Sequence, residues 1–185
     1  MSTTTFAERR SCGADAAFDD ARPVNRRRFV LKNTSRAVHS FVRFVEAELC
    51  RQELSDESSR MHILLALGEA LANALYHGNL ELSSQLREHD DAEFFEIAEY
   101  RRRESPYRDR RIQVEVTVAD DRAVIAVRDD GAGFDPAAIP DPCDPANIGR
   151  VTGRGLLLMR SVMDQVTFNK RGNEVRMVKR WNPGP

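Results

Sequence analysis

The chain has 185 residues, of which 41% are hydrophobic and 31% are charged. This length suits one domain with extensions, and 28 basic residues against 29 acidic ones give no global reason to expect nucleic acid or a membrane surface as a partner. The three cysteines are widely scattered, which argues against a disulfide framework or a structural zinc site and favours a reducing compartment.

The N-terminal segment, residues 1–25, is polar and without periodicity, so we expect a disordered tail. It contains no apolar segment of the signal-peptide type, and no stretch of the chain approaches the roughly 18 apolar residues that a membrane helix needs. We therefore expect a cytoplasmic protein without a membrane partner, folded over residues 26–183.

The first half of this domain predicts a strand followed by two helices. Residues 27–33 are rich in β-forming side chains and predict an edge strand. Thr34 or Ser35 can cap the helix that follows. Its apolar residues recur at helical spacing: Val38, Phe41, Val42, Val45 and Leu49. The second helix begins near residue 56, and we expect it to end at Gly78, because glycine readily takes the left-handed C-terminal cap.

Residues 80–111 form a distinct inserted segment. Asp90 and Asp91 precede an apolar set and arginines 101 to 103 follow it, an order that suits the dipole of a helix. Ser105-Pro106 would end that helix. The segment is rich in arginine, but the preceding acids favour a solvated amphipathic helix over a surface for direct nucleic-acid binding.

The second half predicts strands around one further helix. Apolar and polar residues alternate over 112–118, which indicates a strand with one buried face, and "AVIAVRD" predicts a second strand after a turn. A helix follows at "GLLLMRSV", and a hairpin turned at residues 171–173 closes the chain. This order predicts an α+β fold: a two-layer sandwich of a mixed, mostly antiparallel sheet with helices on one face.

The second helix carries the first of three motifs with candidate chemistry. Glu69 and Asn73 are four residues apart, so both side chains lie on one face of the helix. A carboxamide oxygen suits Mg²⁺, and a carboxylate beside it can orient or deprotonate an attacking hydroxyl or water. An exposed polar stripe would give the same pattern, and the pair alone favours that simpler interpretation.

The second motif, "DDGAG", comes directly after a predicted strand and contains Asp129, Gly131 and Gly133. Glycines at these positions permit positive φ and close approach of the backbone to a ligand. The acid at the strand end can accept a hydrogen bond from an exocyclic amine. An ordinary Asp-Gly turn is the alternative, whereas a calcium loop would need a closing Glu and a Rossmann fingerprint a third glycine.

The third motif, "TGRG", opens the last predicted helix and contains Thr152, Gly153, Arg154 and Gly155. The free N–H groups and the positive dipole end of a helix suit phosphate. A glycine-rich helix cap is the alternative, and a Walker A loop is excluded because no Gly-Lys-Ser/Thr follows. The proline-rich stretch before it, residues 136–151, is long and irregular, as functional loops often are.

In this order and at this spacing, "EALANALYHGN", "DDGAGF" and "GRGLLLM" resemble the three boxes of the Bergerat ATP-binding fold. That superfamily includes gyrase, heat-shock chaperone, histidine kinase and MutL ATPase domains. Within it, "NALYHG" most resembles the bacterial anti-sigma-factor serine kinases. The resemblance covers residues 27–181 apart from much of the insert.

The resemblance implies ATP and Mg²⁺ as cofactors and assigns a role to each motif. Glu69 would be the general base, Asn73 the Mg²⁺ ligand, and Asp129 the contact to the adenine amine. Gly131 and Gly133 would shape the adenine pocket. Under a lid formed by residues 136–151, the phosphates would be bound by four residues: Thr152, Gly153, Arg154 and Gly155.

The resemblance further implies a protein-serine/threonine kinase that phosphorylates a small anti-sigma antagonist, with a sigma factor as a further partner, and it is compatible with a homodimer. A nucleotide-dependent binding switch and a detached histidine-kinase-like ATPase module remain alternatives. Glu69 favours turnover over pure binding but does not choose the acceptor. The insert departs from the compact anti-sigma kinases. We expect it to pack beside the ATP site and to present a face to a partner, so that removal of residues 84–108 leaves ATP binding nearly intact.

Overall fold

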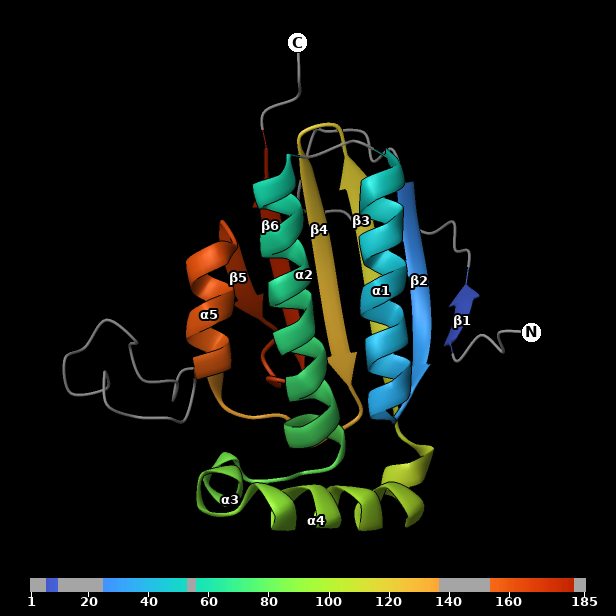
Figure 1. Cartoon of the computed structure of the whole chain (residues 1–185), viewed down its shortest axis with the longest axis vertical. Helices are drawn as coiled ribbons and strands as arrows, with labels where there is room; N and C mark the ends of the chain where they lie inside the picture. Colours follow the sequence, from blue (N-terminus) through green and yellow to red (C-terminus); the bar gives the residue numbers. More distant parts are fainter. Residues whose placement is uncertain (1–5, 10–24, 53–55, 137–153, 182–185) are drawn as a thin grey trace, which may run out of the picture.

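The computed structural model describes residues 6–9, 25–52, 56–136 and 154–181, which form two layers (Figure 1). One layer is an antiparallel sheet with the strand order β1-β2-β3-β4-β6-β5. In chain order these strands are β1 Phe6–Arg9, β2 Asn25–Lys32, β3 Arg111–Ala119, β4 Arg122–Asp129, β5 Gln165–Phe168 and β6 Glu174–Arg180.

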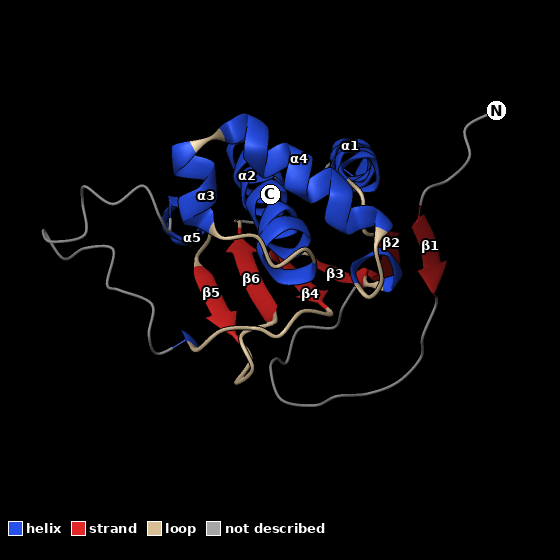
Figure 2. Cartoon of the chain, turned by 90° about the horizontal axis from the view of Figure 1, so that it is seen from below, coloured by secondary structure: helices blue, strands red, loops and turns tan. Residues whose placement is uncertain are grey.

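Helices α1, α2 and α5 cover one face of this sheet, as both views show (Figures 1 and 2). The helices of the inserted segment, α3 and α4, lie across the lower end of the sandwich in Figure 1. The helices are α1 Ser35–Gln52, α2 Glu57–Ala72, the π-helix η1 Asn73–Asn79, α3 Ser84–His89, α4 Asp91–Arg103, the 3₁₀ turn η2 Tyr107–Asp109, and α5 Arg154–Val162. The predicted two-layer α+β fold is therefore confirmed. Its described strand pairs are all antiparallel rather than mixed.

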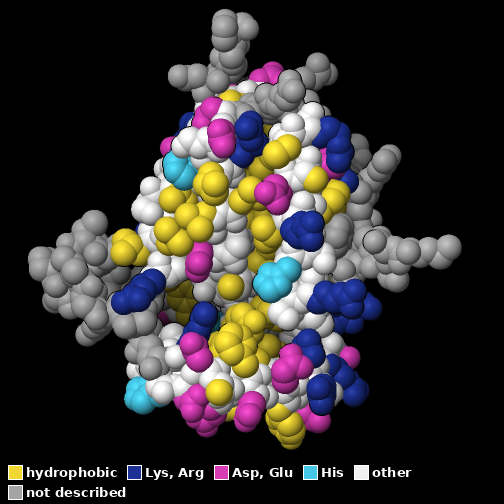
Figure 3. Space-filling view, viewed as in Figure 1, with side chains coloured by type: hydrophobic (Ala, Val, Ile, Leu, Met, Phe, Trp, Pro, Cys, Tyr) yellow, Lys and Arg dark blue, Asp and Glu magenta, His cyan; other side chains and the backbone are white. Residues whose placement is uncertain are grey.

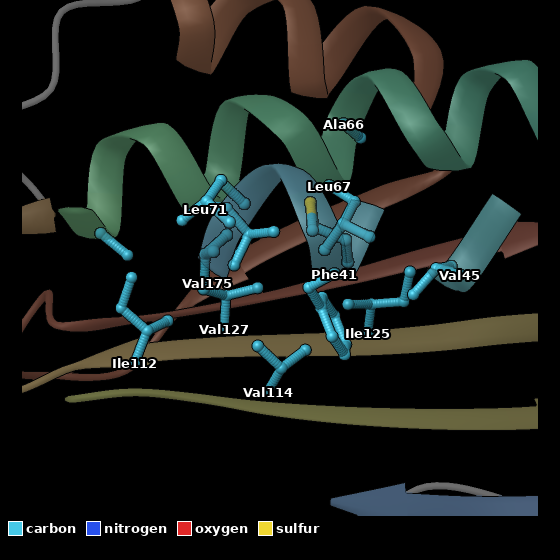
Figure 4. Close-up of a cluster of buried hydrophobic side chains, with 14 of the residues drawn as sticks. Phe41, Val45, Ala66, Leu67, Leu71, Ile112, Val114, Ile125, Val127 and Val175 are labelled. Carbon is cyan, nitrogen blue, oxygen red and sulfur yellow. The ribbon is translucent and has the colours of Figure 1, made fainter. Parts of the chain in front are cut away.

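The core lies between the sheet and the helices (Figure 4). Alternate residues of β3 and β4 point into it, and Leu67 and Leu71 of α2 pack against them. The two-residue period of the strands and the 3.6-residue period of the helix therefore place apolar side chains in the same layer. The largest fully buried side chains include Phe41, Leu67, Leu71, Ile125 and Met177.

The ends of the helices follow capping chemistry. The Thr34 side chain accepts a hydrogen bond from the Ala37 N–H at 3.2 Å, and the Asp56 carboxylate accepts one from the Ser59 N–H at 2.8 Å. The Asp90 carboxylate caps α4 in the same way. These side chains satisfy N–H groups that the helices themselves leave without a partner.

Two local expectations differ from the structure. Phe6–Arg9, inside the predicted disordered tail, pairs with β2 as strand β1, because the open edge of β2 offers a ladder of free backbone groups. The remainder of the tail, apart from Asn25 at the start of β2, lies outside the described residues. Gly78 does not end its helix in a left-handed cap, since the chain continues as the π-helix η1 through Asn79.

No helix in the described part of the chain combines the length and the apolar character that crossing a bilayer requires.

Candidate functional site

The structure brings the first and third motifs together where α2 meets the start of α5. Glu69 and Asn73, both half-buried, share the helix face that is turned toward Gly155. A Cβ built on Gly155 would lie 2.7 Å from Oε2 of Glu69 and 3.4 Å from Nδ2 of Asn73. A side chain at position 155 would therefore displace the Glu69 carboxylate, so the glycine leaves room for that carboxylate at the start of α5.

The second motif lies at the end of β4, where the Asp129 side chain is 9% exposed. Its Oδ1 accepts a hydrogen bond from the Gly131 N–H at 2.8 Å. The carboxyl group also faces Gly78 of η1, because a Cβ on Gly78 would lie 2.4 Å from its carboxyl carbon. Gly131 packs on the same turn, since its own Cβ would lie 2.3 Å from the Gly78 carbonyl oxygen. Two glycines thus make room for one buried acid.

The electrostatic setting of Asp129 is unusual for a carboxylic acid. Burial raises the pKa of Asp129 to about 6. Within that pKa, the Gly131 N–H and the positive charge of Arg110 act to lower the value, and the negative charge of Asp130 acts with burial to raise it. A buried acid held between opposing influences is typical of a functional group rather than of a core position.

The loop after Asp129 is locked to the hairpin that joins β5 to β6. Gly133 has φ +80°, and a Cβ there would lie 2.0 Å from the carbonyl oxygen of Arg171. Gly172 has φ +74°, and its Cβ would lie 2.0 Å from the Phe134 carbonyl oxygen. The Arg171 guanidinium donates to the Gly131 carbonyl at 3.0 Å. Gly133 is therefore needed for backbone conformation and packing, whatever its part in the pocket.

Two buried asparagines to which the sequence assigned no role, Asn79 and Asn173, hold this strand end. The Asn173 side chain donates to the Asp129 carbonyl at 2.9 Å, and the Asp129 N–H donates to the Asn173 carbonyl at 3.0 Å. The Asn79 Oδ1 accepts from the Asp130 N–H at 2.8 Å. The sequence signal for these residues was the Gly-Asn pair at each site, Gly78-Asn79 and Gly172-Asn173. Ordinary turns carry the same pair, so it does not identify a structural role.

The third motif, which is expected to bind phosphate, is only partly within the described residues. Arg154 begins α5 with an exposed side chain, and Gly155 follows it. Thr152, Gly153 and residues 137–151 of the expected lid lie outside the described residues. Their roles stay predictions.

The residues at the α2–α5 contact fit an Mg²⁺ ion that is bound together with a nucleotide. Within the described ranges, no three His, Cys, Asp or Glu side chains gather as a ready-made metal site. Mg²⁺ is commonly bound through one or two protein oxygens, substrate phosphates and water. The carboxamide of Asn73 beside the carboxylate of Glu69 supplies oxygen donors of this kind.

A separate open hollow of about 590 Å³ lies on the outer side of α4, where Phe95, Glu99 and Tyr100 are among its lining residues. The residues of the three motifs do not line it.

Comparison with known proteins agrees with this arrangement. A family model described as "Histidine kinase-like ATPase domain" matches residues 31–179, which include all three motifs and the insert. A comparison with curated proteins gave no match.

Proposed function

The chain belongs to the family of histidine kinase-like ATPase domains and is an ATP-binding module, and from this premise we propose that it is a protein-serine/threonine kinase of the anti-sigma-factor type. Its substrate would be a small protein antagonist, and a sigma factor would be a further partner. One observation carries the proposal: the Glu69 carboxylate lies against Gly155, the second residue of α5, beside Asn73. A carboxylate at a phosphate-binding helix start suits turnover, because it would repel phosphates in a site that only binds them.

The adenine end of the nucleotide is assigned to Asp129. An adenine ring has an exocyclic amine that donates a hydrogen bond. A buried carboxylate with a donor on only one of its two oxygens can accept that bond on the other. The Gly131 N–H occupies Oδ1 of Asp129, so Oδ2 is the oxygen that we assign to the amine. The opposite end of the nucleotide then points along α2 toward Glu69, since both α2 and η1 contribute to the site.

In the proposed reaction, the hydroxyl oxygen of a serine or threonine of the antagonist attacks the γ-phosphorus of ATP. Glu69 accepts the hydroxyl proton, the bond between the γ-phosphorus and the bridging oxygen breaks, and ADP leaves with the electron pair. A positioned general base of this kind contributes roughly 10²–10⁴ in rate. The Asn73 carboxamide would help to hold Mg²⁺, which would neutralise part of the phosphate charge.

The class of acceptor is supported by the sequence at the end of η1. "NALYHG", residues 73–78, resembles the same region of the anti-sigma-factor serine kinases. Gly78 is the residue that makes room for Asp129, so this part of the resemblance concerns a contact at the proposed nucleotide site rather than the helix alone.

Phosphoryl transfer is tested by incubating the protein with γ-labelled ATP, Mg²⁺ and a candidate small antagonist protein. We expect label on a serine or threonine of that protein. Glu69→Ala should lose transfer by roughly 10²–10⁴ while keeping ATP affinity, because a general base acts mainly in the transition state. Glu46→Ala, which removes an exposed glutamate of α1, is the matched control.

The other outcomes separate the alternatives. ATP binding without transfer or hydrolysis would identify a nucleotide-dependent switch, and hydrolysis without transfer would identify an ATPase module. Transfer by Glu69→Ala at the rate of the natural protein would show that Glu69 is not the base.

A further inference from the structure

The inserted segment is tied to the turn that faces Asp129. Figure 3 shows charged side chains of both signs gathered at the lower end of the molecule, where α3 and α4 lie. Arg110, between η2 and β3, points inward from this region with its side chain 17% exposed. It donates to the Asn79 carbonyl at 2.7 Å and to the Glu81 carboxylate at 2.7 Å. The Tyr107 ring lies 5.0 Å from its guanidinium carbon.

Asn79 connects this arginine to the strand end that bears the acid. Asn79 is fully buried, and its Oδ1 accepts from the Asp130 N–H. Its Nδ2 donates to Oδ1 of Asn33 and to the Arg111 carbonyl, both at 3.1 Å. All the hydrogen-bonding capacity of the amide nitrogen is thus used inside the protein, and the position of η1 relative to β4 is fixed from both sides.

Glu81 shows that the same turn is under constraint. Its φ is 54°, in the left-handed region that residues other than glycine rarely occupy. Its carbonyl accepts from Arg101 at 2.8 Å, and its carboxylate pairs with Arg110. A strained backbone of this kind persists when its surroundings determine it, and such positions cluster at binding and switch sites.

We propose that Arg110 is a positioning residue for adenine recognition, which holds the Gly78–Asn79 turn against Asp129 from within the insert. The proposal rests on the adenine role of Asp129 in the proposed function. It follows from the closeness of the packing: Gly78 has no room for even a Cβ beside the carboxyl carbon, so a small movement of this turn changes the orientation of the carboxylate. It adds a role in ATP binding to the expected partner face of the insert, through a residue outside the segment 84–108 whose removal is expected to leave ATP binding nearly intact.

The test measures the affinities of ATP and GTP for the full-length chain with Mg²⁺ by calorimetry. GTP carries a carbonyl where ATP carries the amine, so at that position it presents an acceptor to the Asp129 carboxylate instead of a donor. The ratio of ATP affinity to GTP affinity therefore reports the orientation of that carboxylate. We expect Arg110→Met to lower ATP affinity about tenfold, as the loss of one oriented hydrogen bond does, and to change GTP affinity little. Arg110→Lys should keep part of the preference for ATP over GTP that Arg110→Met loses, because lysine keeps the charge and a donor.

Arg108→Met is the matched control, since Arg108 belongs to the same turn but is exposed and pairs with Asp109. If Arg110→Met folds poorly, Glu81→Gln gives the same readout, because it removes the charge of the ion pair at nearly constant size. An unchanged ratio of ATP affinity to GTP affinity in the folded variants, including an equal loss of both, would overturn the role of Arg110. It would leave the adenine role of Asp129 standing. A natural protein that binds ATP and GTP equally would overturn the adenine role of Asp129 and the inference with it.

Discussion

At the residue scale, Asp129 is a carboxyl group that the fold buries at a cost in stability. Its pKa is raised from 3.8 to about 6, so the folded protein binds this proton more tightly than the unfolded chain does. The contribution of the protonated acid to stability is fully present below pH 3.8 and is lost as the pH rises through 6. The difference between the two pKa values corresponds to a loss of about 3 kcal/mol in the free energy of unfolding above pH 7.

Replacing the acid by its isosteric amide should therefore separate stability from binding. Asp129→Asn keeps an acceptor for the Gly131 N–H but removes the buried charge. We expect the unliganded variant to melt above the natural protein at pH 8, with the difference vanishing toward pH 4. ATP affinity should fall by about 1–3 kcal/mol, because the amide can present its own donors to the adenine amine.

Thermal melts at both pH values and calorimetry with ATP check this prediction. Asp120→Asn, which removes an exposed acid from the β3–β4 turn, should change neither quantity. A variant that melts like the natural protein at every pH would show that the charged acid carries no penalty, and unchanged ATP affinity would remove Asp129 from the adenine contact.

At the element scale, a single glycine at the start of α5, Gly155, leaves room for the Glu69 carboxylate of α2. Alanine at position 155 should raise helix propensity by about 1 kcal/mol. The atom that its Cβ meets, Oε2 of Glu69, is the end of a flexible side chain that can turn away. Stability should therefore change little, while the carboxylate moves out of place.

We expect Gly155→Ala to keep its melting temperature and to lose phosphoryl transfer by about tenfold or more, as misplacement of a catalytic group does. Gly68→Ala, on α2 beside Glu69, is the control, because a Cβ there meets no described atom within 4 Å. It should stabilise the protein by about 0.5–1 kcal/mol and leave transfer unchanged. Full activity in Gly155→Ala would contradict the placement of α5 against Glu69.

The π-helix η1 is the element that carries the helix past the expected end. The N–H of Leu80 donates to the carbonyl of Leu75, five residues earlier, which widens the last turn. This turn places Gly78 against Asp129 and the Asn79 side chain against Asp130. An ordinary cap at Gly78 would end the helix before Asn79 could make those contacts.

At the scale of the whole molecule, the sheet extends beyond the strands that surround the site. β1 is a four-residue edge strand on β2, on the side of the sheet remote from β4 and β6. The stabilisation from its backbone hydrogen bonds is largely offset by the entropic cost of ordering the N-terminal segment. Its contribution to the site is therefore expected to be small.

A chain that begins at Pro23 lacks β1 and should keep its ATP affinity. Its melting temperature should fall by about 2–4 °C, as a loss near 1 kcal/mol does in a protein of this size. Calorimetry and thermal melts measure both, and a chain that begins at Thr5 keeps β1 and serves as the control. A fall of more than about 10 °C would mean that the N-terminal segment contributes to the core.

The sequence by itself determined the features that have a short period or a short range. Alternation over 112–118 predicted β3, helical spacing predicted α1, and the four-residue spacing of Glu69 and Asn73 placed both on one helix face. The order of the three motifs also pointed to the ATP-binding family that the family model matches. These features are readable because a helix and a strand impose fixed periods on neighbouring residues, and because three motifs in a fixed order are far more specific than any one of them.

Only the tertiary structure decided which of these local features meet. Gly155 lies against Glu69, Gly78 lies against Asp129, and Arg110 of the insert reaches the carbonyl of Asn79. Each contact joins residues far apart in the chain, and each depends on a single glycine or hydrogen bond rather than on a repeating pattern. Close approach of two backbones and the pairing of buried polar groups leave no period in the sequence, so they can be found only once the helices are packed on the sheet.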